Sequence, residues 1–541
     1  MIFTHNERIL ILGAGIMQGP ALRIAREMGL KTVAVDGDPQ APCISLADRF
    51  ECIDLKEKEK ITAFGRLLRL EGGLSGIMTA GTDFSASVAY AAEKLGLPGI
   101  PYEAALNASD KERMRQCFKQ AGLPSPEFMV LRESPRPGFI LPFGYPVVVK
   151  PVDNMGGRGC RRVDSPAGLE PAVKDALRFS RSGRAIVEEY MDGPEFSLDA
   201  VVYQGEVTLC GFADRHIFFP PYFIEMGHTM PSELEEKFQA QVVEVFTAGI
   251  RALGITLGAA KGDLKLSSRG PMIGEIAARL SGGYMSGWTY PYASGVEPIR
   301  GAILAALGKK PETLAPCRNW TSAERAFISI PGRIRSVRGV EEAGSAEHIK
   351  NLFLRVKTGD RVRFPENNVG KCGNVISAAP SRQAAITAAE RAACSIGIRL
   401  EAPDEETETF LAGGPFPGTE NPTAHIPPAF RVSPVILDHL SVLPEPLVPS
   451  GGTEDFFILP FPKFTESGIL DFMGRSVETS LGMVRNLTGF SLPVGVEGGE
   501  DRIPLGRSFW SALIRGGYQG GAYWVDRLVY EIKTGRNLES L

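Results

Sequence analysis

The stretch GDLKLSSRGPMIGEIAARLSGG, residues 262–283, decides the fold of this chain. It reads as two apolar strands joined by a polar Ser-Ser-Arg-Gly-Pro turn, and each strand carries one acid, Asp263 or Glu275. Acids on adjacent strands of a hairpin can converge on one face, where they suit a hard cation that bridges phosphates. Because alternate residues of a strand share a face, Glu275, Ala277 and Arg279 point the same way. A plain charged face is the alternative, which an acid within an apolar strand disfavours.

A second informative stretch is YPVVVKPVDNMGGRGC, residues 145–160. Lys150 ends an apolar strand, and Gly156, Gly157 and Gly159 follow it within a few residues. Glycines let backbone N–H groups approach a phosphate, and a lysine on a strand supplies compensating charge. The Gly-Lys-Ser/Thr ending of a Walker A loop is absent, so the pattern favours a β-hairpin loop over phosphates. A strand-end lysine that reaches solvent is the alternative.

A third stretch, IVEEYMDGPEFSLD, residues 186–199, is a strand that breaks at Asp192-Gly193-Pro194. The break leaves backbone N–H and C=O groups unpaired, and such groups could bind an adenine edge. Glu188, Glu189 and Glu195 surround the break, and an acid in this position could accept both ribose hydroxyls. An ordinary hairpin turn is the alternative interpretation.

Near the N-terminus, residues 9–38 form a strand, a glycine turn, a helix and a second strand that ends in Asp36. This βαβ pattern with a distal acid is typical of a dinucleotide site. However, Gly13, Gly15 and Gly19 follow Gly-x-Gly-x-x-x-Gly, which places the third glycine one residue late. A nicotinamide-dependent oxidoreductase therefore stays open at this point as an alternative.

Composition limits the class of protein. A chain of 541 residues is too long for one hydrophobic core, so three or four domains are expected. A net charge of −4 gives no reason to expect nucleic acid or an anionic membrane as partner. No apolar run approaches the roughly 20 residues that cross a bilayer, and the N-terminus lacks the features of a signal peptide. The eight cysteines are scattered, which favours reduced thiols in a cytoplasmic protein.

These stretches occur in the order of a known family, and the chain resembles an ATP-grasp carboxylate–amine ligase over residues 1 to about 400. The motifs that carry the resemblance are SDKERMRQCFKQAGLPSPEFMVL, YPVVVKPVDNMGGRGC, AIVEEYMDGPEFSLDA and GDLKL…GEIAARLSGG, behind a Rossmann-like domain. Within the family, FIEMGHTMPSELEE and EIAARLSGG are closest to the L-amino-acid ligase group. The resemblance implies a biotin carboxylase-like ATP-grasp fold, in which the glycine turn near the N-terminus binds no dinucleotide.

The expected fold class is therefore α/β and α+β, with an additional C-terminal region. The expected domains are a Rossmann-like domain at 1–108, an ATP-grasp domain with the nucleotide and Mg site at 109–318, a β-rich C-terminal subdomain at 319–400, a Pro/Gly-rich linker at 401–450 and a mixed, partly helical extension of unknown role at 451–541.

The resemblance also implies a set of site residues. Lys111 and Lys150 would bind ATP phosphates, and a loop from Asn154 to Cys160 would close over them. Asp263 and Glu275 would hold Mg²⁺, and Arg279 would stabilise an acyl phosphate. The other implied contacts, grouped by role, are Glu188, Glu189, Tyr190 and Met191 for adenine, Glu195 for ribose, and Glu225, His228, Ser281, Gly282, Gly283 and Met285 for the acceptor.

One departure from the family pattern concerns the metal. Many relatives carry Asn two residues after the second acid, where this chain has Ala277, so the number of metal ions is left open. His228 is as compatible with a structural role as with a substrate contact.

The implied reaction forms an amide or peptide bond through an acyl phosphate and releases ADP and phosphate. ATP and Mg²⁺ are the expected cofactors, and a small carboxylate and an amine, with amino acids foremost, are the expected substrates. A homodimer is compatible with the resemblance. A nucleotide-binding regulatory or scaffolding protein without turnover is the second alternative, and a ligase with an acceptor other than an amino acid is the third.

Overall fold

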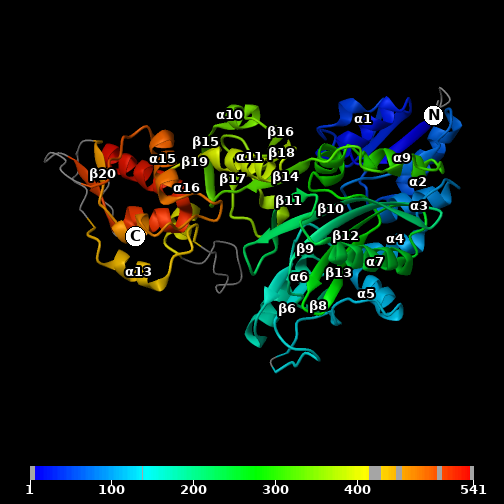
Figure 1. The fold of residues 1–541 in the computed structure, drawn as a ribbon, viewed down its shortest axis with the longest axis horizontal. Coiled ribbons are helices and arrows are strands. Elements are labelled where there is room, and N and C mark those ends of the chain that lie inside the picture. The colour runs from blue at the N-terminus through cyan, green and yellow to red at the C-terminus, as the bar shows by residue number, and fades with distance from the viewer. Residues whose placement is uncertain (1–6, 137, 414–427, 446–453, 496–501, 536–541) are drawn as a thin grey trace. The chain divides into compact units, whose positions relative to one another are not determined.

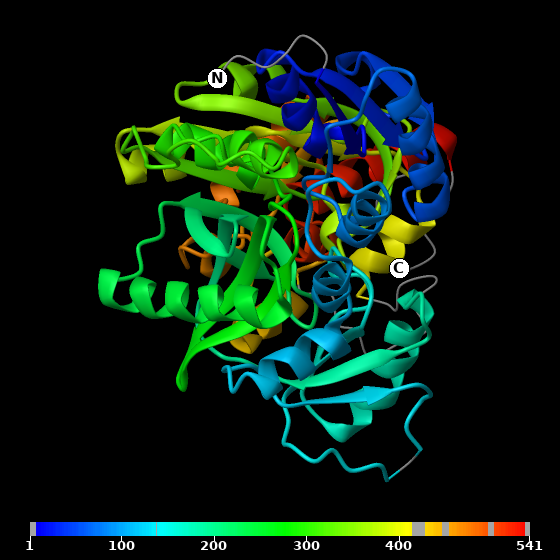
Figure 2. The ribbon, with the colours of Figure 1, turned by 90° about the vertical axis from the view of Figure 1, so that its right-hand side faces the viewer.

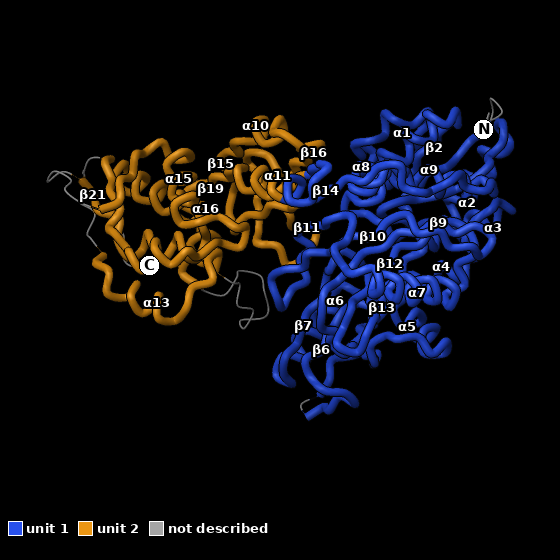
Figure 3. The backbone as a smooth tube through the Cα atoms, in the orientation of Figure 1, with its two compact units in different colours: residues 1–324, 376–386 blue, residues 325–375, 387–541 orange. Residues whose placement is uncertain are grey.

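The computed structural model describes residues 7–136, 138–413, 428–445, 454–495 and 502–535. The chain divides into two compact units (Figure 3). Unit 1 comprises residues 1–324 and 376–386, and unit 2 comprises residues 325–375 and 387–541. The unit boundaries fall within β14 (Thr321–Phe327), β18 (Gly373–Ala379) and α11 (Arg382–Ser395).

Unit 1 begins with a parallel sheet of order β3-β2-β1-β4, drawn in blue in Figure 1. Ile9 and Ile11 of β1 pack into one core with α1 and α9, whereas Leu10 and Leu12 pack into another with α2 and α3. A strand that is buried on both faces reads as a continuous apolar run. The elements are β1 (Arg8–Leu12), β2 (Lys31–Asp36), β3 (Arg49–Cys52), β4 (Gly76–Met78), α1 (Gly19–Glu27), α2 (Lys58–Leu70), α3 (Ser85–Lys94) and α9 (Pro298–Ala306).

The glycine turn after β1 is closed by its own neighbours. The Ala14 N–H donates to Asp36 Oδ2 at 2.8 Å, and the Gly15 N–H donates to Gln18 Oε1 at 3.1 Å. The backbone donors that would hold a pyrophosphate, and the acid that would hold a ribose, are thus already hydrogen-bonded. This geometry argues against a nicotinamide site here.

A small antiparallel sheet follows, with the order β5-β8-β6-β7 (Figure 2, cyan). Val147 and Val149 of β6 share a buried core with α6, so Lys150 lies on the opposite face of the strand. The strand–glycine loop–strand predicted around Lys150 is confirmed. The elements are α5 (Lys111–Gln120), β5 (Phe128–Leu131), β6 (Val147–Pro151), β7 (Arg161–Val163), α6 (Leu169–Phe179) and β8 (Ala185–Glu189).

The rest of unit 1 contains five antiparallel strands in the order β13-β12-β9-β10-β11. Phe246 and Ile250 of α7 pack against Leu264 and Ile276 of β12 and β13. Gly249 allows this close approach, because a Cβ there would lie 2.5 Å from Ile276 Cδ1. The elements are α4 (Tyr102–Ser109), β9 (Glu195–Tyr203), β10 (Glu206–Phe218), β11 (Ile224–Met230), α7 (Glu236–Leu253), β12 (Gly258–Ser267), β13 (Gly270–Ala277) and α8 (Tyr290–Ser294).

Unit 2 contains a three-stranded sheet, a set of helices and its own apolar core. The sheet has the order β17-β15-β19, and both strand pairs are antiparallel. The elements are β15 (Gly332–Arg338), α10 (Val340–Ser345), β16 (Ile349–Leu354), β17 (Arg361–Val362), β19 (Gly397–Leu400), α12 (Glu405–Leu411), α13 (Pro434–Ser441), β20 (Phe456–Ile458), α14 (Pro462–Thr465), α15 (Val477–Thr488), β21 (Ile503–Leu505) and α16 (Arg507–Thr534).

The C-terminal part of unit 2 contains the segment that was expected as a linker and the C-terminal extension. Residues 401–450 include α12 and α13, and Phe410 and Phe430 are fully buried there. The described part of this segment is therefore packed, although residues 414–427 and 446–450 lie outside the described residues. The predicted helical C-terminus with a glycine interruption is confirmed, because α16 bends at Gly517 (φ 62°, ψ −149°).

Within the described ranges, none of the helices has the length and apolar character of a membrane span. All eight cysteines carry free thiols.

Candidate functional site

Lys111 begins α5 and connects the glycine loop to the β12–β13 hairpin. Its Nζ donates to the Asn154 carbonyl at 2.9 Å and lies 3.7 Å from Glu275 Oε2. The helix start is fixed by Asp110, whose carboxylate accepts the first free N–H groups of α5, as an N-cap does. Burial acts to lower the pKa of Lys111, but Glu275 and Asp83 outweigh it, so the pKa is raised and the ammonium stays charged.

Lys150 is held by a buried acid on the neighbouring strand. Its Nζ lies 2.7 Å from Glu188 Oε2, while Arg115 Nε donates to Glu188 Oε1 at 2.8 Å. Burial acts to raise the pKa of Glu188, but the two cations outweigh it and lower the pKa to about 2. The Glu188 carboxylate is thus engaged by Lys150 and Arg115, so its predicted place in an adenine pocket rests on its backbone alone.

Asp263 and Glu275 are cross-strand partners in the β12–β13 register. The hairpin predicted from the sequence is confirmed, and both acids are ionised. Burial acts to raise the pKa of each carboxyl, but Arg215 and Lys261 lower that of Asp263, and Lys111 and Lys150 lower that of Glu275. Lys150 and Glu275 therefore interact electrostatically, although they lie on strands of two different sheets.

These two acids fit a hard divalent cation, since carboxylate oxygens are the ligands that Mg²⁺ prefers. Among the described residues, no group of three or more His, Cys, Asp or Glu side chains could hold a metal ion. The pair would hold Mg²⁺ only together with other oxygen ligands, which nucleotide phosphates provide.

Asp263 also lies in a wider charge network. Arg215 Nη1 is 3.1 Å from Asp263 Oδ2 and is also paired with Glu195, while Arg215 Nη2 is 2.9 Å from Glu225. Lys261 pairs with the same Asp263 oxygen. Arg215 thereby joins the acid expected at the ribose, the acid expected at the metal and the acid expected at the acceptor.

The strand break at 192–194 is tied to β12. Lys265 Nζ donates to the Met191 carbonyl at 3.1 Å and lies 3.7 Å from Glu195 Oε2. The Tyr190 ring has the Arg162 guanidinium 4.4 Å from its centre. Gly193 has a left-handed φ of 81°, and a Cβ there would overlap the Leu266 carbonyl.

The segment between β8 and β9 that contains this strand break is called the hinge below. Glu189, the last residue of β8 before the hinge, lies 3.1 Å from Arg269 on the β12–β13 turn.

The glycine loop has the conformation that glycine favours. Gly156, Gly157 and Gly159 have φ values of 68°, 74° and 66°, which L side chains rarely adopt. Asn154 fastens the start of the loop, because its Nδ2 donates to the Phe179 carbonyl at 2.7 Å.

His228 lies between two acids on the expected acceptor side. Its Nδ1 is 2.9 Å from Glu324 Oε2, and its Nε2 is 3.5 Å from Glu225 Oε2. Burial acts to lower the pKa of His228, but Glu225 and Glu324 outweigh it and raise the pKa. Gly283 fits closely against this pair, because a Cβ there would lie 2.9 Å from Glu225 Oε1.

Ser281 and Gly282 precede that contact. The Ser281 N–H donates to Asp199 Oδ1 at 2.9 Å, and its hydroxyl donates to Asp199 Oδ2. Gly282 lies against Gly81, because a Cβ at Gly282 would be 3.2 Å from the Gly81 carbonyl oxygen. The 281–283 loop is thus fixed at both ends by buried contacts.

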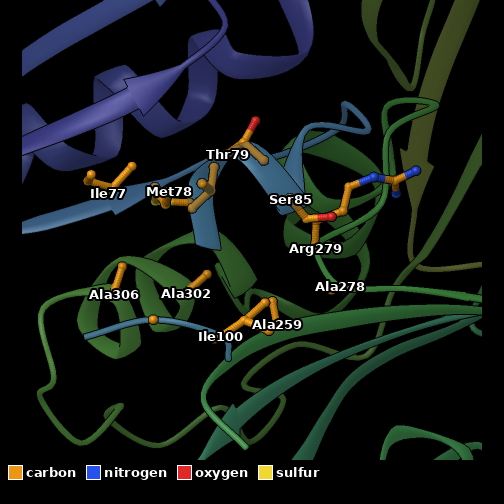
Figure 4. A pocket seen from close by; sticks show the side chains of 13 residues that line it. Ile77, Met78, Thr79, Ser85, Ile100, Ala259, Ala278, Arg279, Ala302 and Ala306 are labelled. Carbon is orange, nitrogen blue, oxygen red and sulfur yellow. The ribbon is translucent and has the colours of Figure 1, made fainter. Parts of the chain in front are cut away.

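Arg279 follows β13 and lies near the connection between β4 and α3. Its Nη2 lies 3.8 Å from Asp83 Oδ1, and its Nη1 donates to the Leu280 carbonyl at 3.3 Å. An apolar cavity of about 40 Å³ borders the same residue, with Ile77, Met78 and Ile100 in its wall. Figure 4 shows the Arg279 guanidinium pointing away from this apolar lining.

The sequence-based site therefore comes together from separate segments, but several of its members were missed. Lys261 could have been found, because it stands two residues before Asp263 and so shares its face of β12. Asp83 lies just after β4, at the carboxyl end of a parallel strand, where ligands bind in open α/β sheets. Arg215 lies in a strand without a motif, and no sequence signal marks it. Asp199 is the last residue of the 186–199 stretch, but its contact with Ser281 was not predicted.

Two segments of the chain match known protein families. Residues 143–287 match the ATP-grasp domain family, and residues 326–401 match the L-amino acid ligase C-terminal domain 2. The uncharacterized protein y4rH of Sinorhizobium fredii is 25% identical over 379 residues, covering 69% of this chain and 78% of that protein.

Carnosine synthase 1 of Gallus gallus is 29% identical over 336 residues, and the match covers 57% of this chain but only 36% of the synthase. The crystal structure of L-amino acid ligase from Bacillus licheniformis superimposes with a TM-score of 0.66 at 23% identity, over 74% of this chain and 100% of that one. The chain thus has the ATP-grasp fold predicted from its motifs, and it contains an ATP-grasp domain followed by an L-amino acid ligase C-terminal domain.

Proposed function

We propose that this protein activates a small carboxylic acid, with amino acids foremost, as an acyl phosphate and transfers the acyl group to an amine. The observation that carries the proposal is the convergence of Lys111, Lys150, Asp263 and Glu275 from α5, β6, β12 and β13. Lys111 is within 3.7 Å of Glu275, and Lys150 lowers the pKa of the same acid. Two lysines and two ionised acids suit the binding of a metal–triphosphate complex.

In the proposed reaction, a carboxylate oxygen of the acid attacks the γ-phosphorus of ATP. The bond from that phosphorus to the β–γ bridging oxygen breaks, and ADP leaves. Lys111 and Lys150 offset the phosphate charge, and Asp263 and Glu275 would hold Mg²⁺, which when bound neutralises charge on the phosphate oxygens. Most of the catalysis is positioning and electrostatics, so a side-chain nucleophile is not required.

The second step belongs to Arg279 and the acceptor side. The amine attacks the carbonyl carbon of the acyl phosphate, phosphate leaves with the C–O bonding electrons, and the amine loses a proton. Arg279 would stabilise the oxyanion that forms at the carbonyl. Glu225, His228 and the 281–283 loop would line the amine, while the 154–160 loop would exclude water.

The proposed nucleotide contacts are the backbone of the hinge and Glu195, the acid expected at the ribose. The backbone at Met191 and its neighbours would bind the adenine edge, and Glu195 would accept the ribose hydroxyls. Lys265 supports this arrangement, because it is hydrogen-bonded to the Met191 carbonyl and lies near Glu195.

The test is a screen of amino acids and small carboxylates for ADP release, with hydroxylamine as a trap for the activated acyl group. The expected result is acid-dependent ADP formation together with the matching hydroxamate. Lys150→Ala should abolish it, and Glu275→Gln should lower kcat by roughly 10²–10³-fold, as the loss of one electrostatic contact does. The control Glu244→Gln changes an exposed acid of α7 and should leave the rate unchanged.

ATP binding without ADP release for any acid would favour a regulatory or scaffolding role. Turnover that persists in Lys150→Ala or Glu275→Gln would remove that residue from the mechanism.

A further inference from the structure

Asp83 is an acid beside Arg279 that the proposed reaction does not yet use. It lies in the short connection between β4 and α3, and its side chain is 13% exposed while that of Arg279 is 12% exposed. The connection is fixed to the segment after β13 that carries Arg279, because the Gly81 N–H donates to the Leu280 carbonyl at 3.2 Å. Asp83 is therefore held close to the guanidinium.

The Asp83–Arg279 pair has unused hydrogen-bonding capacity. The two side chains are 3.8 Å apart, which is longer than a hydrogen bond. Within the described residues, the buried Arg279 Nε has no hydrogen-bond partner, and Arg279 is the one ion-pair partner found for Asp83. Buried polar groups are normally hydrogen-bonded, so the Arg279 Nε requires an acceptor, and the Asp83 carboxylate beside it has room to accept from a donor.

An amino acid supplies both groups in one molecule. Its carboxylate can accept from a guanidinium, and its ammonium, one or two carbons away, can donate to an acid. We propose that Asp83 is a specificity-determining residue that binds the ammonium of the acid substrate while Arg279 binds the carboxylate. This inference rests on the proposed function, and it adds that the activated acid must carry a cationic nitrogen near its carboxylate.

Selectivity follows from the cost of leaving Asp83 without a donor. A site built around a hydrogen bond to a substrate group strongly rejects the analogue that lacks this group. The same acid substrate without its amino group would leave the partly buried Asp83 carboxylate without this donor. The neighbouring Glu275 and Asp83 both act on Lys111, so Asp83 lies at the phosphate end of the site, where the acid must be activated.

A simpler interpretation is that Asp83 only orients Arg279. The two roles differ in one measurable respect. A residue that orients Arg279 affects every acid equally, whereas a residue that binds the ammonium affects amino acids alone.

The experiment compares matched acids, L-alanine with propionate and L-leucine with 4-methylpentanoate, with hydroxylamine as the common acceptor. In the unmodified protein, kcat/KM should favour each amino acid by about a hundredfold or more, the range of a lost hydrogen bond to a charged group. Asp83→Asn should lower kcat/KM for the amino acids at least tenfold and leave that for the amino-free acids unchanged. Asp38→Asn, an exposed acid of the same domain, is the matched control and should change neither.

Equal losses for both members of a pair would overturn the proposal and assign Asp83 to orienting Arg279. If Asp83→Asn is inactive with all acids, calorimetry with a non-hydrolysable ATP analogue decides the matter. Loss of L-alanine binding with propionate binding retained supports the proposal, and parallel loss of both overturns it. Absence of turnover with every acid in the unmodified protein would instead count against the proposed function itself.

Discussion

At the scale of single residues, Asp199 is a buried acid whose negative charge destabilises the folded state. Burial raises the pKa of Asp199 to about 6, although Ser281 donates two hydrogen bonds to it. The folded protein therefore binds this proton more tightly than the unfolded chain does. Stability should fall as the pH rises from about 4 through 6, since the ionised form is favoured less in the folded state.

Asp199→Asn removes this effect while keeping an acceptor for the Ser281 N–H. We expect the variant to be more stable than the unmodified protein at pH 8, by up to about 3 kcal/mol, because the shift is about two pKa units. The gain should shrink below pH 6 and vanish near pH 4. Urea unfolding of unit 1, followed by hydrogen–deuterium exchange of β9 from pH 4 to 8, measures this gain in stability. A variant that is less stable than the unmodified protein at pH 8 would contradict the prediction.

Side chains that lie in a regular strand pattern were the part of the site that could be predicted best from the sequence. Asp263, Glu275 and Lys150 each stand at a fixed place in a strand pattern, so their faces follow from alternation alone. Asp83 and Arg215 could not be placed in this way. Their roles depend on which strands become neighbours, and that is decided by tertiary pairing between segments far apart in the chain.

At the scale of elements, the hinge between β8 and β9 depends on a close backbone approach at Gly193. A Cβ there would overlap the carbonyl of Leu266 in β12, and its φ of 81° is unfavourable for alanine. Gly205, in the β9–β10 turn, has a φ of 80° with open space around it, so it offers a matched control.

We expect Gly193→Ala to separate the hinge from β12 and to raise the KM for ATP about tenfold or more, equivalent to about 1.4 kcal/mol. Gly205→Ala has the same backbone strain, about 1–2 kcal/mol, and should leave this KM unchanged. Steady-state kinetics on both variants provide the measurement. Equal effects of the two substitutions would show that strain alone, and no hinge contact, is responsible.

Elements with a strong local signal were predicted well. The α5 helix begins at its Asp110 cap, and the β12–β13 hairpin follows its turn residues. The segment at 401–450 was expected as a linker because of its prolines and glycines, yet Phe410 is buried in it. Proline content indicates the local backbone conformation, whereas the packing of Phe410 depends on α16, which is distant in the sequence.

At the scale of the whole molecule, unit 2 is completed by the C-terminal helix. Gln519 of α16 is 4% exposed, and its Oε1 accepts from the Ile330 N–H at 3.1 Å, while its Nε2 donates to Ser329 Oγ at 2.7 Å. The same Nε2 lies 3.4 Å from the Ile398 carbonyl. One side chain of the extension thus satisfies polar groups within the segment that matches the L-amino acid ligase domain.

Gln519→Leu should destabilise unit 2 by about 1–3 kcal/mol, because it leaves the buried Ile330 N–H without its acceptor. Hydrogen–deuterium exchange should show faster exchange of β15 and β19, with unit 1 and its ATP affinity unchanged. Gln120→Leu, at an exposed position, is the control. Unchanged exchange in unit 2 would mean that the extension is not needed for the stability of this domain.

The pairing of Asp263 with Lys261 and Arg215 has a consequence for the order of substrate addition. A free divalent cation would have to displace two resident positive charges from this carboxylate. A cation that arrives already complexed to a triphosphate brings anionic oxygens that can receive those displaced groups. We therefore expect steady-state kinetics in which the metal–nucleotide complex adds as a single reactant and uncomplexed metal alone binds weakly.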